Sequence, residues 1–240
     1  MISKKVISNI LSKCYLGNSI ESVEWEIREE NLYINFMNGP ETLVGYVEYR
    51  DSIGLKNGNY RIYNTSNLIK CINILDGDIL LASDNDYLNI ADTNYEIRFS
   101  LAESGIIKQA EPIDSNDYNW VASFSINDEF ITRFVKSKDA LGEDVFTIKT
   151  REGFTGEELV FTIGTDITNT VEFIVENATI NESFEEIIFD SNLFKEILKA
   201  NRTYHSGEIR INPKGVLDIH LHCGGPLYTG YILVRNENNN

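Results

Sequence analysis

The sequence predicts an α+β fold with two similar domains, each carrying two helices packed on antiparallel sheets. Three observations support this. The segment SNLIK at residues 66–70 recurs as SNLFK at residues 191–195, a shift of 125 positions, and the same shift carries Leu16-Gly17 onto Leu141-Gly142. Both halves show the same order of helical and strand patterns, and all four predicted helices share one type of apolar stripe. A duplicated unit is therefore expected.

The first half begins with a helix predicted over residues 3–16, where apolar residues share one face and Gly17 can end the helix. A second helix is expected to start at the capping residues 64–66 and to end at residues 76–78. Alternating or continuous apolar runs, separated by Asn, Asp and Gly turn residues, predict strands between and after these helices. The six expected strands cover residues 23–28, 32–37, 43–49, 79–83, 87–91 and 95–101.

The second half repeats this scheme, with helices predicted over residues 126–139 and 190–202. The predicted domains are residues 1–101 and 123–240, joined by a connector at 102–122. The expected strands of the second half cover residues 145–150, 159–163, 170–176, 185–189, 208–212, 216–223 and 228–235.

Composition narrows the class of protein. The 240 residues carry a formal net charge of −16, which opposes a general affinity for nucleic acid. No run reaches the roughly 18 apolar residues of a membrane span, and the N-terminal pattern is not that of a signal peptide, so a cytoplasmic protein is expected. The three cysteines lack CxxC spacing, which argues against a disulfide framework or a structural zinc site. Nucleotide-binding and nucleophile motifs are not found, so we expect no cofactor and no catalysis.

The predicted helices depart from the acidic character of the chain. They contain twice as many basic as acidic residues, and three of the acids stand at helix starts, where they favour the helix dipole. Four basic outer faces in an acidic protein favour a localised anion-binding surface. The basic residues are Lys4, Lys5, Lys13, Lys70, Arg133, Lys136, Lys138, Lys195, Lys199 and Arg202.

One other pattern is a candidate site. Asp218, His220 and His222 alternate along a predicted strand, so they could face one metal ion, but apolar residues alternate with them as in an ordinary half-buried strand. A metal-dependent enzyme would explain this run but not the duplication. A structural or adaptor protein of a virion would explain the duplication and the acidic surface, but not the basic helices.

The chain resembles the ring-shaped DNA polymerase processivity clamps, most closely those of large tailed bacteriophages. The resemblance lies in the basic first helix and in the segments 63–70, 88–92, 111–113 and 231–234. It implies the DNA-clamp fold, with helices lining a hole and sheets forming the outer wall. Encircling duplex DNA takes about six such domains in this family, so two per chain imply a closed homotrimer. A sliding clamp tethers the replicative DNA polymerase and is loaded by an ATP-driven clamp loader; it is not an enzyme.

The resemblance also implies roles for particular residues. The ten basic residues of the helices would face DNA. The ring joint would pair the last strand of the first domain with an edge strand of the second, and so involve Tyr95, Arg98, Glu172 and Phe173. Partner proteins would dock peptides near the connector and the last strand, at Ile106, Ile107, Pro112, Ile113 and Leu233. No metal site is expected. If the protein is viral, it acts in the cytoplasm of a bacterial host.

Overall fold

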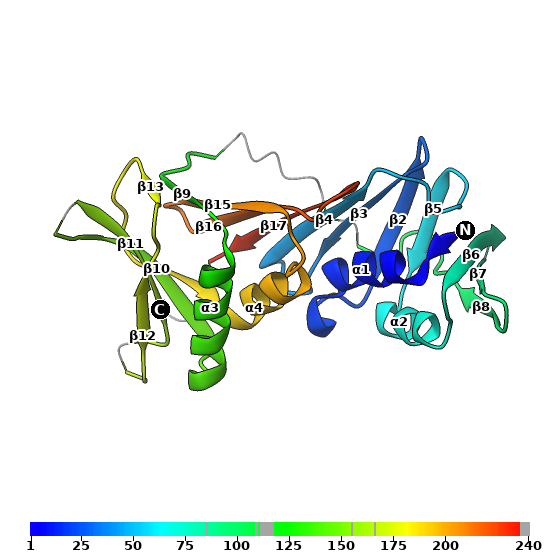
Figure 1. Ribbon diagram of the computed structural model, residues 1–240, viewed down its shortest axis with the longest axis horizontal. Helices are drawn as coiled ribbons and strands as arrows, with labels where there is room; N and C mark the ends of the chain where they lie inside the picture. Colours follow the sequence, from blue (N-terminus) through cyan, green and yellow to red (C-terminus); the bar gives the residue numbers. More distant parts are fainter. Residues whose placement is uncertain (85, 109, 111–117, 155, 166, 236–240) are drawn as a thin grey trace. The chain divides into compact units, whose positions relative to one another are not determined.

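The chain forms two compact units in a computed structural model, which describes residues 1–84, 86–108, 110, 118–154, 156–165 and 167–235 (Figure 1). The first unit is Met1–Pro112 with Cys223–Thr229, and the second is Ile113–His222 with Gly230–Asn240. The division falls within the expected connector. The late segment 223–229 groups with the first unit, although the sequence analysis placed it in the second; there the Arg50 N–H donates to the Pro226 carbonyl at 2.9 Å.

Among the described residues, the first unit contains two helices and two groups of hydrogen-bonded strands. One group is a four-stranded sheet of order β1-β6-β7-β8, and the other, of order β4-β3-β2-β5, is one stretch of a longer sheet. A 3₁₀ turn at Leu16–Asn18 follows the first helix. The elements are β1 (Ile2–Ser3), α1 (Lys4–Tyr15), β2 (Val23–Arg28), β3 (Asn31–Met37), β4 (Leu43–Tyr49), β5 (Gly58–Ile62), α2 (Thr65–Asn73), β6 (Asp78–Asp84), β7 (Tyr87–Ala91) and β8 (Glu96–Ser100).

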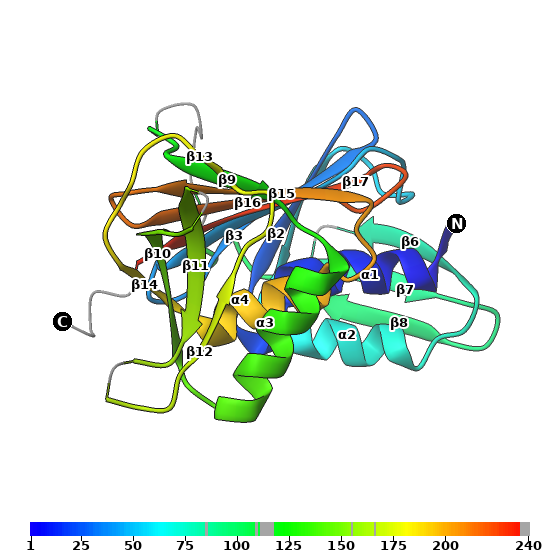
Figure 2. The ribbon, with the colours of Figure 1, turned by 60° about the vertical axis from the view of Figure 1, so that its left-hand side comes forward.

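The second unit repeats this plan (Figure 2). Its sheets have the orders β12-β11-β10-β14 and β9-β15-β16-β17, with a short β13 beside β9. The elements are β9 (Ala122–Ser125), α3 (Asp128–Leu141), β10 (Val145–Glu152), β11 (Glu157–Ile163), β12 (Val171–Ile174), β13 (Thr179–Ile180), β14 (Ile187–Asp190), α4 (Ser191–Ala200), β15 (Ser206–Asn212), β16 (Val216–His222) and β17 (Leu227–Val234).

The two topologies correspond element by element. In chain order, β1, α1 and β2–β4 match β9, α3 and β10–β12, while β5, α2 and β6–β8 match β14, α4 and β15–β17. The sheet orders then coincide: β1-β6-β7-β8 matches β9-β15-β16-β17, and β5-β2-β3-β4 matches β14-β10-β11-β12. The structure thus confirms the duplication predicted from the repeat at 125 positions.

Local capping explains where the helices begin. The side chain of Asn127 accepts a hydrogen bond from the Phe130 N–H at 2.7 Å, and Asp190 accepts one from the Leu193 N–H at 2.9 Å. Gly142, with φ of 73°, ends α3 in the left-handed conformation that glycine adopts readily. No helix in the described ranges has the length and apolar character needed to cross a bilayer.

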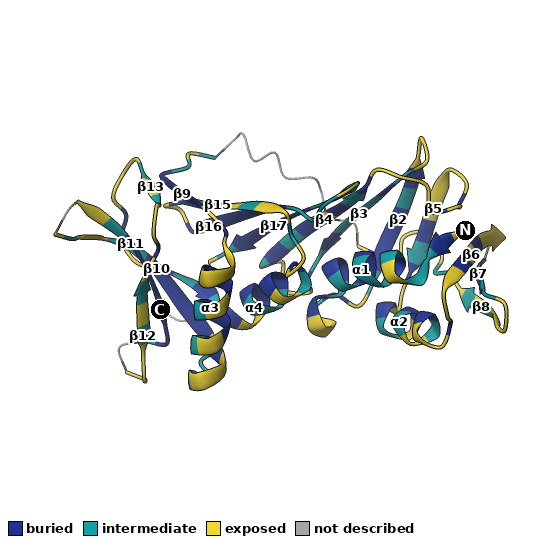
Figure 3. Cartoon of the chain, viewed as in Figure 1, coloured by how far each residue is buried: buried dark blue, intermediate teal, exposed yellow. Residues whose placement is uncertain are grey.

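Each helix buries one face and leaves the other exposed (Figure 3). In the second unit the buried face is largely aromatic: the ring of Phe134 lies 4.7 Å from that of Phe194 and 5.1 Å from that of Phe146. Apolar burial of this kind sets the rotation of a helix about its axis. The residues opposite the apolar stripe are consequently held on the outer face.

Candidate nucleic-acid interface

The outer faces of the helices carry exposed cations in both units. Lys5 and Lys70 are exposed in the first unit, and Lys136, Lys199 and Arg202 are exposed in or after the helices of the second. Across the described ranges, the side chains of Lys5, Lys70, Lys136 and Arg202 have no ion-pair partner, while Lys199 lies 3.4 Å from Glu196. Unpaired cations attract anions most strongly because no neighbouring carboxylate competes.

A hollow brings two of these cations together in the second unit. It lies beside α3, where Lys136 and Arg202 both contribute to its lining. An ammonium and a guanidinium beside one hollow can bind a phosphate, the guanidinium in a bidentate manner. The lining residues are Asp128, Ile131, Thr132, Val135, Lys136 and Arg202.

Lys13 and Lys138 correct the sequence prediction, because both are buried although both were expected to face DNA. Lys13 is 0% exposed and Lys138 is 4% exposed. They are 125 positions apart, so they occupy the same place in the two units. Burial lowers the pKa of Lys13, an effect that the charge of Cys223 partly offsets. The spacing contained part of the signal: each lysine lies three residues after a buried stripe residue, Ile10 or Val135, and so next to the apolar stripe.

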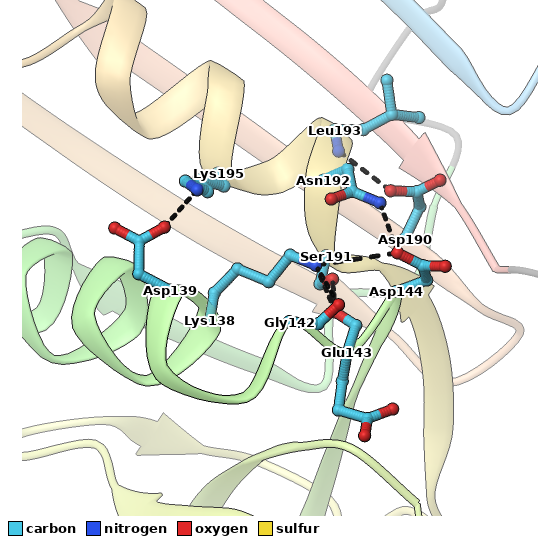
Figure 4. Close-up of polar contacts among 10 residues, drawn as sticks. All are labelled: Lys138, Asp139, Gly142, Glu143, Asp144, Asp190, Ser191, Asn192, Leu193 and Lys195. Atoms are coloured by element: carbon cyan, nitrogen blue, oxygen red, sulfur yellow. Dashed lines mark hydrogen bonds and ion pairs between the residues drawn. The ribbon is translucent and has the colours of Figure 1, made fainter.

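Lys138 instead stabilises the end of its helix. Its Nζ donates to the carbonyl oxygen of Gly142 at 3.1 Å and to that of Glu143, and it lies 3.7 Å from a carboxylate oxygen of Asp144 (Figure 4). A lysine in the last turn can satisfy carbonyl groups that have no partner within the helix. Its role is therefore structural.

Lys4 similarly joins the two helices of the first unit. Its Nζ donates to the carbonyl oxygens of Asn73, at 2.9 Å, and of Leu75. These carbonyls lie at the C-terminal end of α2, where a cation is favourable. Lys4 remains partly exposed.

Two further cations of the predicted set are held in ion pairs. Arg133 pairs with Glu129, one turn away, and lies 3.6 Å from Glu176. Lys195 pairs with Asp139 of the neighbouring helix (Figure 4), and this contact raises the pKa of the lysine and lowers that of the carboxyl group. Paired side chains contribute less to an external anion.

The strands expected at the ring joint each lie at the end of a sheet. β8 ends the sheet β1-β6-β7-β8, and β12 ends the sheet that begins β12-β11. Arg98 covers the Tyr87 ring at 3.5 Å, and Glu172 forms an ion pair with Arg151. Tyr95 directly precedes β8 and is 50% exposed, and Phe173 is half-buried in β12.

The expected peptide-docking residues are not brought together as one exposed group. Ile106 is 55% exposed, whereas Ile107 is 8% exposed and Leu233 is 0% exposed. The last two pack into the protein and cannot offer a free apolar surface, so they are removed from the candidate pocket. Pro112 and Ile113 lie outside the described residues.

The Asp218, His220 and His222 run has a structure that differs from a solvated strand face. Asp218 is 1% exposed, accepts a hydrogen bond from Arg210 Nε at 3.0 Å and lies 2.9 Å from His220 Nε2. Arg210 also covers the Trp120 ring at 4.8 Å, so residues before β9 help to bury this face. The described ranges contain no group of three His, Cys, Asp or Glu side chains placed to hold a metal ion.

Comparisons with known proteins bear on the fold. No protein-family model matches the chain, and no curated protein sequence matches it. Among solved structures, the proliferating cellular nuclear antigen of Entamoeba histolytica matches with a TM-score of 0.75 at 13% identity, over 98% of this chain and 96% of that one. The chain therefore has the fold of this nuclear antigen, which confirms the predicted α+β DNA-clamp fold.

Proposed function

We propose that the protein is a sliding clamp that encircles duplex DNA and tethers the replicative DNA polymerase. One observation carries the proposal: exposed cations with no ion-pair partner among the described residues lie on the outer faces of helices in both units of a chain whose net charge is −16. The fold match adds that these helices belong to a DNA-clamp fold. An acidic protein whose helices carry exposed cations on their outer faces is suited to holding DNA against those helices.

The contact with DNA is non-specific in this proposal. Lysine and arginine side chains neutralise phosphates without reading base edges, so the contact is weak, sensitive to salt and compatible with sliding. Lys5 and Lys70 provide it in the first unit, and Lys136, Lys199 and Arg202 provide it in the second. The acidic remainder of the surface repels duplex DNA and favours the hole of the ring.

The assembly is a closed homotrimer. β8 and β12 are different surfaces of one chain, so pairing them between copies gives a head-to-tail contact, which closes a ring when the rotation allows. Tyr95, Arg98, Glu172 and Phe173 contribute to this joint. The partners are a DNA polymerase and an ATP-driven clamp loader, and the exposed Ile106 remains a candidate contact for a partner peptide.

The remaining elements of the proposal follow from the resemblance to phage clamps. The protein performs no catalysis and needs no cofactor, because positioning of the polymerase is the whole function. It acts in the cytoplasm, which is that of a bacterial host cell if the protein is viral.

Primer extension tests the polymerase-tethering role. A singly primed DNA circle is copied by the polymerase of the same virus or cell, with a trap that prevents rebinding, and product length is measured with and without the protein, the loader and ATP. Longer products are expected only when all three are present. Products of unchanged length with the loader and ATP present would contradict the proposal.

A further inference from the structure

Backbone hydrogen bonds determine which groups of β8 point away from its sheet. The Leu101 N–H donates to the Asp86 carbonyl at 2.8 Å, and the Asp92 N–H donates to the Tyr95 carbonyl at 3.0 Å. In an antiparallel pair, every second residue bonds to the partner strand, so Ile97 and Phe99 also bond to β7. The backbone groups that point outward are those of Glu96, Arg98 and Ser100.

The same reasoning applies to β12. The Val175 N–H donates to the Leu159 carbonyl at 2.9 Å, and the register then makes Phe173 and Val171 the residues that bond to β11. Glu172 and Ile174 are left with outward-facing N–H and carbonyl groups. The two strands therefore offer free edges of matching period.

The free edges restrict how a second copy can pair. Every strand pair with a described register is antiparallel. If β8 and β12 also pair in this way, Arg98 can lie only opposite β12 residues whose backbone N–H and carbonyl groups face outward. Those residues are Glu172 and Ile174, or Thr170 one step before the strand. Pairing with Phe173 is excluded because its backbone groups are already used by β11.

Charge distinguishes the remaining registers. Arg98 opposite Glu172 joins opposite charges and places Glu96 opposite Ile174. If β8 is displaced by two residues so that Arg98 lies opposite Thr170, Glu96 lies opposite Glu172, where like charges repel. If β8 is displaced by two residues the other way, Arg98 lies opposite Ile174 and the charge pair is lost.

We infer the register of this joint: where β8 of one copy pairs antiparallel with β12 of a second copy, Arg98 lies directly opposite Glu172. This inference rests on the proposed ring and assigns its register. Arg151 already pairs with Glu172, so Arg98 would add a second cation to one carboxylate across the joint. An exposed charged pair of this kind contributes more to register than to affinity.

The apolar faces agree with this register. Ile97 would lie opposite Phe173, and Phe99 opposite Val171; all four side chains are half-buried in the single chain because each edge leaves them partly uncovered. Phe173 borders a hollow lined by residues of β12, β9 and the first turns of α3. Ile97 of the second copy would cover this hollow, whose lining includes Phe124, Phe130, Phe173, Glu129, Arg133 and Glu176.

Disulfide trapping tests the register. Directly opposite residues in a non-hydrogen-bonded pair have Cα atoms about 4.5 Å apart, which suits a disulfide, whereas diagonal neighbours lie about 7–8 Å apart. The variant Ile97→Cys with Phe173→Cys keeps Arg98 and Glu172; it is oxidised, and cross-linked chains are counted on a denaturing gel. The matched control is Phe99→Cys with Phe173→Cys, and the wild-type chain measures background from the native cysteines.

Efficient linkage of chains in the first variant, with at least about fivefold less in the control, is the expected result. Linkage mainly in the control would show that the register is displaced by two residues. Linkage in neither variant, while the native mass stays trimeric, would show that the joint lies elsewhere. Either result would overturn the inferred register and leave the proposed ring intact. A monomeric native mass for the wild-type chain would overturn the ring as well.

Discussion

Replacing Lys5 and Lys136 by glutamine tests the DNA-facing surface most selectively. Each lysine is exposed on the first helix of its unit, and neither has an ion-pair partner in the part of the chain that the structure describes. Glutamine keeps helix propensity close to that of lysine, so folding should be unchanged. The substitutions therefore remove charge and little else.

The expected effect is a weaker dependence of DNA binding on salt. Each phosphate neutralised contributes about −0.9 to the slope of log K against log salt concentration. A trimer carries each substitution three times, so the double variant removes up to about six contacts and flattens the slope by at most about five. A duplex that touches one side of the hole at a time gives a smaller change, of at least about one.

Fluorescence anisotropy of a short linear duplex, titrated at several salt concentrations, measures the slope. The matched control is Lys56→Gln with Lys214→Gln, which makes the same charge change at exposed positions outside the helices, one in each unit. The control should keep the wild-type slope. Equal flattening in both variants would show that net charge, rather than the helix faces, governs binding, and would refute the reasoning.

Three further predictions concern the buried lysines and the sheet edge. Lys138→Ala should lower the free energy of unfolding by about 1–3 kcal/mol in urea titrations, because a buried side chain is lost and two partly buried carbonyls lose their donor, whereas Lys136→Ala should change it by less than about 0.5 kcal/mol. Burial lowers the pKa of Lys13, so the unfolded chain binds more protons there, and wild-type stability should rise relative to Lys13→Met as pH increases toward 10.5; a constant difference between pH 7 and pH 10 would contradict this. Ile174→Pro removes an outward N–H and should yield monomers in native mass measurements, while Ile174→Ala, which keeps that N–H, should remain largely trimeric; trimeric Ile174→Pro would show that this edge is not the joint.

Much of the fold could be predicted because the relevant signals are local or periodic. The repeat at 125 positions and the apolar stripes placed three of the four helices within about two residues of their observed ends, within the usual disagreement over helix boundaries. The second helix ends at Asn73, at least three residues before the predicted end at 76–78. β5 was missed because it starts with Gly58 and Asn59, and only Tyr60 and Ile62 are buried. Short strands with one or two buried side chains lack a period that can be recognised.

The candidate site was less predictable because it depends on partners distant in sequence. The pairing of Arg133 with Glu176 and that of Lys195 with Asp139 bring together residues dozens of positions apart. Helical periodicity shows that a lysine lies near an apolar stripe. It does not show whether carbonyl groups lie close enough to accept hydrogen bonds from the buried ammonium group, as they do for Lys138. Composition alone therefore overstated the number of cations available to DNA.

The most direct test of the central claim is whether retention on DNA depends on topology. The protein is loaded on a nicked circular duplex, free protein is removed at moderate salt, and one half of the sample is cut at a single site. A ring that encircles the duplex should stay on the intact circle and slide off the cut molecule, so bound protein should fall only after cutting. Equal retention on circular and cut DNA at the same salt would show binding by affinity and would contradict the clamp account.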